Sequence, residues 1–396
     1  MSTIQLAPNN LAFKFESPGR YATHTNYLNG HHAFDILEFN AYLNIPYHLT
    51  DTFKFTNLSR LKNPKRKVLI SHIRERINSD SKILRSQAVF INWLVQSEVC
   101  TPEQIMYVVG CQTEQDFHHE YVQACLKEHT FRHKIKILSY PHFETDAIWR
   151  MYQEGLSIAN RNYDELRTFV KKDFLFLNAK IHKTNRINLA VDLYQRGLLE
   201  HGIYSLNTTH TSKELYPLVQ HLIDEDSFGH FYSKIPESPD NINYDGAADH
   251  YLGYPFDYTL YEKTKFSLIA ETHYENNPFL LTEKTSRPIL NKHPFVIAST
   301  AGFLKQLQSF GYTTFSELWS EEYDLEADTT KRLRMIADTV DYIHSNTIDW
   351  VHAYRISKEN YSILQRRYDH SVELLTEFLD TISIEDELKN KFRRYV

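Results

Sequence analysis

The sequence predicts an α/β protein with two parallel-sheet domains and a set of C-terminal helices. Short apolar runs of four to six residues alternate with helical patterns of ten or more residues, which is typical of βαβ units. This alternation runs through the first part of the chain and restarts after the charged stretch 161–172. A length of 396 residues also fits two domains, because a domain usually holds about 100–200 residues.

The first alternation begins at Lys67. Its apolar runs predict strands at 68–70, 105–109 and 135–138. Its helical spacing of apolar residues predicts helices at 83–95, 117–126 and 148–158. Residues 1–60 are rich in Asn, His and Tyr without a clear period, so we expect loops and short elements there.

The second alternation has the same character. It predicts strands at 174–177, 203–206, 266–270 and 295–298, and helices at 186–199, 215–223, 282–291 and 303–310. The polar segment 225–255 contains Gly and Pro and predicts a long loop. Two amphipathic helices are expected at 329–343 and 361–379. We therefore predict domains at 1–165 and 166–345, with 346–396 as helices that pack across both.

The charge balance argues against a protein that grips nucleic acid mainly through its phosphates. The chain has 44 Lys and Arg against 50 Asp and Glu, a formal net charge of −6, whereas such proteins usually carry a basic domain. One basic cluster, Lys62, Lys65, Arg66 and Lys67, precedes a predicted strand. It is either a solvated loop or a local phosphate-contacting patch.

Three further observations suggest a cytoplasmic protein. The cysteines Cys100, Cys111 and Cys125 are odd in number and lack CxxC spacing, which argues against a disulfide framework. The first residues show no signal-peptide pattern. No apolar run approaches the ~20 residues that a membrane span needs.

The stretch 265–297 holds the pattern that bears most on function. A predicted strand ends in Glu271, and after a loop Thr282 can cap a helix whose first turn contains Glu283 and Lys284. A helix N-terminus favours anions, so a lysine there suggests a bound phosphate. The pattern suits a nucleotide diphosphate, with Glu for ribose hydroxyls and Lys for phosphates. An exposed helix start and a turn-capping Glu271 would explain the same residues.

This pattern resembles the donor-binding motif of the α-1,3-fucosyltransferases, which reads Phe-Glu-Asn-Ser and then Thr-Glu-Lys-Leu. The chain departs from it at Thr272, where those enzymes have Asn, and at Thr285, where they have Leu. More broadly, residues 170–345 resemble the sugar-nucleotide domain of GT-B glycosyltransferases, including phage and giant-virus members. The resemblance implies two Rossmann-like domains that face each other across a cleft.

The same resemblance implies a hexosyl- or pentosyltransferase whose co-substrate is a nucleoside-diphosphate sugar, with no other cofactor. It implies Glu271 and Lys284 as catalytic residues. The implied donor-binding residues are Arg186, Asn178, Lys180, Thr282, Glu283 and Thr285. The N-terminal domain would bind the acceptor, a glycan or a small molecule. The expected location is the cytoplasm, or the host cytoplasm if the protein is viral.

No metal site is expected. The chain has 21 histidines, but the pairs His31-His32 and His118-His119 are adjacent in sequence, and adjacent side chains point in different directions. No HExxH or facial-triad spacing occurs. Side chains and a helix dipole would then neutralise the diphosphate leaving group.

An inverting transferase would also need a general base on the acceptor side, usually a carboxylate. The candidates at predicted strand ends are Glu75, Glu114 and Glu144, and the sequence does not rank them. A retaining enzyme would need no such base. Two alternatives stay open: a DNA-modifying glycosyltransferase that acts on hydroxymethylated bases, and a non-catalytic GT-B-like binding protein.

Overall fold

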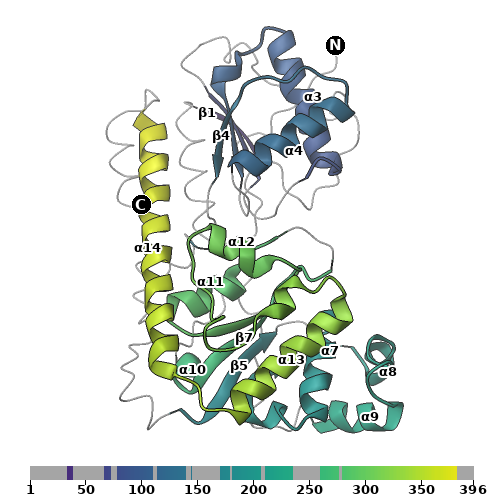
Figure 1. Ribbon diagram of the computed structural model, residues 1–396. Coiled ribbons are helices and arrows are strands. Elements are labelled where there is room, and N and C mark those ends of the chain that lie inside the picture. Colours follow the sequence, from purple (N-terminus) through teal and green to yellow (C-terminus); the bar gives the residue numbers. More distant parts are fainter. Residues whose placement is uncertain are drawn as a thin grey trace. The chain divides into compact units, whose positions relative to one another are not determined.

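The computed structural model describes ten parts of the chain. They are residues 34–38, 67–72, 78–109, 114–139, 144, 170–178, 181–206, 210–234, 259–275 and 279–380. The chain divides into two compact units. The first comprises Met1–Thr145, His250–Leu252 and Tyr368–Val396, and the second comprises Asp146–Asp249 and Gly253–Arg367. Each unit contains a four-stranded parallel sheet (Figure 1), which confirms the predicted α/β class.

The sheet of the first unit follows the order of the chain. Its strands are β1 (Phe34–Glu38), β2 (Lys67–His72), β3 (Ile105–Val109) and β4 (Lys136–Ser139), and each pairs in parallel with the next. Helix α3 (Lys82–Gln96) links β2 to β3, and α4 (Glu114–Lys127) links β3 to β4. Right-handed crossovers that run in the same direction place both helices on the same face of the sheet. There the two helices contact each other.

The core of this unit lies between the helices and the sheet. Leu84, Ala88 and Ile91 form the buried stripe of α3 at helical spacing. On the other helix Phe117 is buried, and its ring lies 4.3 Å from that of Tyr107 on β3. The predicted strands and helices from 67 to 138 are therefore confirmed. The predicted helix at 148–158 lies outside the described residues.

In the sheet of the second unit, successive strands are added on both sides of the first strand. Its strands are β5 (Lys172–Asn178), β6 (Gly202–Leu206), β7 (Thr264–Ala270) and β8 (Phe295–Ala298), in the spatial order β6-β5-β7-β8. All neighbours are parallel. The chain adds β6 on one side of β5 and then β7 on the other, so a topological switch point lies between β5 and β7. In open parallel sheets, ligands bind outside the carboxyl ends of the strands at such a point.

Helices cover both faces of this sheet (Figure 1). Helix α7 (Thr184–Gln195) links β5 to β6, and α11 (Glu283–Leu290) links β7 to β8. Right-handed crossovers in opposite directions place these two helices on opposite faces. Helix α13 (Thr329–Ser345) contacts α7, and α10 (Thr259–Glu262) contacts β7, as α11 does. Helix α12 (Phe303–Ser309) follows β8, and α14 (Trp350–Asp380) follows α13.

The predicted helix at 215–223 is wrong. The chain forms α8 (Ser212–Leu215) and then a 3-10 turn, Tyr216–Leu218, because Pro217 lacks the N–H that an α-helix needs. Part of the predicted loop at 225–255 is also wrong, since Glu225–Lys234 form α9. Asp224 accepts a hydrogen bond of 2.9 Å from the Ser227 N–H at the start of this helix, and the side chains of Phe228 and Phe231 are buried.

Two other helix boundaries differ from the prediction. Helix α7 ends at Gln195 instead of 199, because Gly197 adopts a left-handed conformation with φ +71° just after the C-cap. Helix α14 begins at Trp350 instead of 361. The ring of Trp350 stacks on Phe266 of β7 at 6.4 Å, so packing on the sheet orders this earlier part of the helix. Of the helices in the described part of the chain, none combines the length and apolar character that a bilayer span requires.

Candidate functional site

Glu271 and Thr282 meet at the switch point of the second unit. Glu271 follows the last residue of β7 and has no exposed surface. Its Oε2 accepts hydrogen bonds from the Thr282 hydroxyl at 2.6 Å and from the Thr272 N–H at 3.2 Å. Its Oε1 accepts from the Thr285 hydroxyl at 2.6 Å and from the Thr282 N–H at 3.2 Å. The predicted proximity is confirmed, and the carboxylate fastens the start of α11 to the end of β7.

Thr282 is the N-cap of α11, as the sequence predicted. Its hydroxyl oxygen accepts a hydrogen bond of 3.3 Å from the Lys284 N–H while its proton is donated to Glu271. The start of α7 lies at the same edge, because the Asn185 side chain donates a hydrogen bond of 3.2 Å to the Glu271 carbonyl. The next residue, Arg186, is buried. The beginnings of α7 and α11 therefore converge on the end of β7.

Lys284 and Glu283 form an ion pair at the start of α11. The Lys284 Nζ lies 2.6 Å from Oε1 of Glu283, 3.4 Å from the Thr272 hydroxyl and 3.5 Å from the Thr282 hydroxyl. The Lys284 side chain is 22% exposed and the Glu283 side chain 17%, so solvent and solutes can reach the pair. Burial raises the pKa of Glu283, but Lys284 and Arg287 outweigh it and hold the pKa at about 2. Glu283 is therefore an ionised hydrogen-bond acceptor at neutral pH.

Asn178 supplies an unsatisfied polar group at the same edge. It is the last residue of β5. Leu175 of β5 lies opposite Ser267 of β7, so the same register three residues further along places Asn178 level with Ala270. Asn178 is 1% exposed, and neither its side-chain oxygen nor its nitrogen has a hydrogen-bond partner in the described structure. A buried unsatisfied group costs about 1–3 kcal/mol, so each calls for an explanation, and a polar ligand that bonds to it is one.

The remaining candidates from the sequence are less informative. Lys180 lies outside the described residues, as do Glu75 and most of the basic cluster at 62–67. Glu114 is exposed at the start of α4, and its Oε1 accepts a hydrogen bond of 3.3 Å from the Ser139 N–H. Glu144 is buried. Either glutamate as general base stays a prediction.

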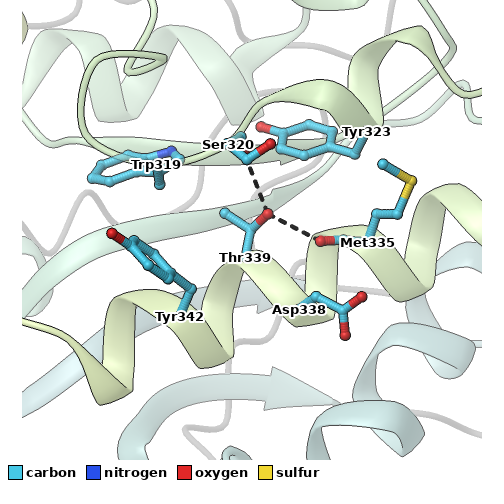
Figure 2. A pocket seen from close by; sticks show the side chains of 7 residues that line it. All are labelled: Trp319, Ser320, Tyr323, Met335, Asp338, Thr339 and Tyr342. Atoms are coloured by element: carbon cyan, nitrogen blue, oxygen red, sulfur yellow. Dashed lines mark hydrogen bonds between the residues drawn. The ribbon is translucent and has the colours of Figure 1, made fainter.

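A pocket of about 450 Å³ lies beside α13 (Figure 2). Its lining residues are Trp319, Ser320, Tyr323, Met335, Asp338, Thr339 and Tyr342. The Thr339 hydroxyl lies 3.0 Å from the Met335 carbonyl and 3.3 Å from the Ser320 carbonyl. Asp338 pairs with Arg196 at 2.7 Å. Three of the seven lining residues are aromatic, and the one charged lining residue, Asp338, already has a partner.

Asp324, which follows a residue of this pocket, has a structural role. Its carboxylate accepts hydrogen bonds from the N–H groups of Leu304 at 2.9 Å and Lys305 at 3.2 Å. Its carbonyl accepts a third from the Gly302 N–H at 2.7 Å. Asp324 therefore caps the start of α12 from a distant part of the chain.

No protein-family model and no curated protein sequence matches the chain. Its structure is similar to solved α,α-trehalose-phosphate synthases. The enzyme from Burkholderia vietnamiensis is 10% identical with a TM-score of 0.41, over 84% of this chain and 79% of that one. The enzyme from Burkholderia xenovorans is 10% identical with a TM-score of 0.42, over 86% and 83%. The enzyme from Burkholderia multivorans is 12% identical with a TM-score of 0.42, over 82% and 73%. Likeness at this level does not assign an activity to the chain.

Proposed function

We propose that the chain is a glycosyltransferase that moves a hexose or a pentose from a nucleoside-diphosphate sugar to a hydroxyl group of a glycan or small-molecule acceptor. The observation that carries this proposal is the convergence of Lys284, the start of α11 and the unsatisfied Asn178 amide on one switch point. Such an edge offers a cation and a positive helix dipole to a diphosphate, and a buried amide to the polar groups of a donor.

Lys284 and Glu283 exchange partners when the donor binds. Glu283 pairs with Lys284 at 2.6 Å and neutralises its charge. A diphosphate carries more negative charge than one carboxylate and competes with Glu283 for the ammonium group. Glu283 then becomes free to accept hydrogen bonds from ribose or sugar hydroxyls. Lys284 stabilises the charge that develops on the departing diphosphate, which is where such a cation lowers the barrier most.

Glu271 is a positioning residue in this proposal, together with Thr282 and Thr285, in place of the catalytic role and the donor contacts that the sequence predicted for them. Its carboxylate has no exposed surface, and four donors occupy it. It does not contact the donor itself. It fixes the position of the start of α11, and with it the position of Lys284. Its catalytic contribution is to hold that geometry, because small displacements of reacting groups cost large factors in rate.

Phosphate neutralisation in this proposal needs no metal ion. Lys284 and the dipole of α11 lie where the leaving group forms, and Arg186 at the start of α7 supplies a second cation at the same edge. Lys180 is the further phosphate contact that the sequence predicts. Asn178 hydrogen-bonds the donor with the amide that is unpaired without it.

A donor screen tests the proposal. Thermal unfolding is measured with UDP, GDP, ADP, CMP and dTDP sugars, because a ligand that binds only the folded state raises the melting temperature. Lys284→Gln should lower the affinity for the donor that binds by about tenfold or more, since a hydrogen bond to a charged group contributes about 1.5–3 kcal/mol. Lys331→Gln, at an exposed lysine of α13, is the matched control.

Sugar transfer to an acceptor separates an enzyme from a binding protein. The donor that binds is supplied with a labelled sugar, and the label is followed into glycans, small alcohols and hydroxymethylated DNA. Transfer to DNA alone would replace the proposed acceptor class, and binding without transfer or hydrolysis would make the chain a binding protein. The site assignment is overturned if no donor binds, or if Lys284→Gln binds the donor as tightly as the wild type does.

A further inference from the structure

Asp173, His201 and His344 form a cluster at the opposite edge of the second sheet. Asp173 is near the start of β5, His201 immediately precedes β6, and His344 lies in the last turn of α13. One nitrogen or oxygen atom from each residue lies within 4.8 Å of those of the other two. The cluster is at the amino ends of the strands, whereas the site around Glu271 is at the carboxyl ends, so it has no part in the proposed transfer reaction.

The three side chains lie close enough to one another to share a ligand. The Nδ1 atom of His344 lies 2.6 Å from Oδ2 of Asp173, and the rings of His201 and His344 lie 4.1 Å apart with 32° between their planes. The side chains of His201 and His344 are 42% and 33% exposed, whereas that of Asp173 is 11% exposed. An ion can therefore reach the imidazoles from solvent and be held by a carboxylate that is largely buried.

Lys265 holds the Asp173 carboxylate in place. Its Nζ lies 2.6 Å from Oδ1, so the other oxygen, Oδ2, faces His344. This arrangement resembles the outer contacts that orient ligands in metal sites. The positive charge of Lys265 also lowers the affinity of the cluster for a cation. The exposed Glu200, whose Oε1 lies 3.8 Å from Nε2 of His201, adds a negative charge and an oxygen that can serve as a fourth ligand atom.

We propose that Asp173, His201 and His344 bind one Zn²⁺ ion or a similar transition-metal ion, with Glu200 or water as a further ligand. Two imidazoles and a carboxylate suit Zn²⁺ and do not suit Mg²⁺ or Ca²⁺, which prefer oxygen ligands. Ligand atoms on one Zn²⁺ lie about 3 Å apart, since each bond is about 2 Å long. Small rotations of the exposed imidazoles bring the three atoms to that spacing. The ion takes the place of the proton between Asp173 and His344.

Bound metal would tie three elements of the second unit together. The ligands come from β5, the turn before β6 and the end of α13, and 171 residues separate Asp173 from His344. Because the cluster forms only when the unit folds, metal binding stabilises the folded state. The site is therefore structural, and its loading is measurable without any enzyme assay.

Metal titration of the untagged, chelator-treated full chain tests this proposal. Isothermal titration calorimetry with ZnCl₂ is done on the wild type, on His201→Ala and on the double variant His201→Ala/His344→Ala. His352→Ala, which changes a histidine of α14 outside the cluster, is the control. The wild type should bind one equivalent of Zn²⁺ that the double variant does not bind, and His201→Ala should bind it at least about tenfold more weakly. MgCl₂ should produce no such difference.

A second measurement keeps the test valid if His344→Ala impairs folding. The absorption spectrum of Co²⁺ reports the coordination of the ion, and the exposed His201 can be replaced alone. The wild type should show the bands of a four- or five-coordinate Co²⁺ ion with nitrogen and oxygen ligands, and His201→Ala should lose them. Equal Zn²⁺ stoichiometry and affinity in the wild type and His201→Ala would overturn the proposal, as would the absence of Zn²⁺ binding by the wild type.

Discussion

The Thr282 hydroxyl donates a hydrogen bond of 2.6 Å to Oε2 of Glu271, and this contact joins the N-cap of α11 to the residue that follows β7. One buried carboxylate thereby organises a helix start that displays Glu283 and Lys284. The first prediction concerns the stability that this contact provides.

Glu271→Ala should lower the free energy of unfolding by about 3 kcal/mol. The change leaves the buried hydroxyls of Thr282 and Thr285 without their acceptor, and each unsatisfied buried group costs about 1–3 kcal/mol. Urea unfolding followed by circular dichroism measures the effect. Thr285→Ala removes one of the four donors and should cost only about 1 kcal/mol. A Glu271→Ala midpoint equal to that of the wild type would contradict this account of the carboxylate.

Glu283→Gln should separate phosphate binding from donor binding. The neutral side chain no longer competes for Lys284, so affinity for inorganic pyrophosphate should rise about two- to fivefold, as expected for a partly exposed ion pair. Affinity for the complete nucleotide sugar should fall, because Glu283 is the proposed acceptor for its hydroxyls. Calorimetry with both ligands measures the two changes. Glu225→Gln, at the exposed start of α9, should change neither, and weaker pyrophosphate binding by Glu283→Gln would argue against the exchange of partners.

Asn178→Leu should lower the affinity for the donor without lowering the free energy of unfolding. Its amide is buried and unpaired in the described structure, so a leucine of similar size removes an unfavourable group while it also removes the proposed ligand contact. Asn185→Leu is the matched comparison, because that amide donates to the Glu271 carbonyl and its loss should cost about 1–2 kcal/mol. Urea unfolding and donor titration are measured on both variants. If Asn178→Leu were the less stable of the two, the Asn178 amide would be structural.

Glu321 should make stability fall as the pH rises from 5 to 8. Burial raises the pKa of this carboxyl from 4.5 to about 7, although Thr314 and the Phe315 N–H, which donates to it at 2.8 Å, oppose the shift. A raised carboxyl pKa means that the folded state binds the proton more tightly. The stabilisation is therefore complete below pH 4.5 and is lost as the pH passes 7.

The Glu321→Gln variant isolates that dependence. It should unfold with a free energy that changes less between pH 5 and pH 8 than that of the wild type, by about 2 kcal/mol. Denaturant unfolding at several pH values in this range measures the difference. Glu322→Gln changes the exposed neighbour and should keep the wild-type dependence. Parallel curves for Glu321→Gln and the wild type would show that Glu321 does not titrate in this range.

Local pattern was sufficient to predict most strands and the meeting of Glu271 with the start of α11. Buried parallel strands appear as apolar runs, so β5, β7 and β8 were recognisable, and the sequence Thr282-Glu283-Lys284 marks a helix start. The rule that carboxyl ends of parallel strands share an edge then placed Glu271 beside Thr282. Helix α9 carried a usable signal in Asp224, Phe228 and Phe231, and the loop composition around it obscured that signal.

The amino-acid sequence by itself determined the α/β class, the N-cap at Thr282 and the placement of Glu271 at the end of a strand, because each depends on neighbours along the chain. Only the tertiary structure decided the order β6-β5-β7-β8, since short apolar strands carry no information about their partners. It also decided that four donors would enclose Glu271 and that the Asn178 amide would lack a partner. Asp173 and His344 are 171 residues apart in sequence, and only the packing of α13 against the sheet brings them within 2.6 Å.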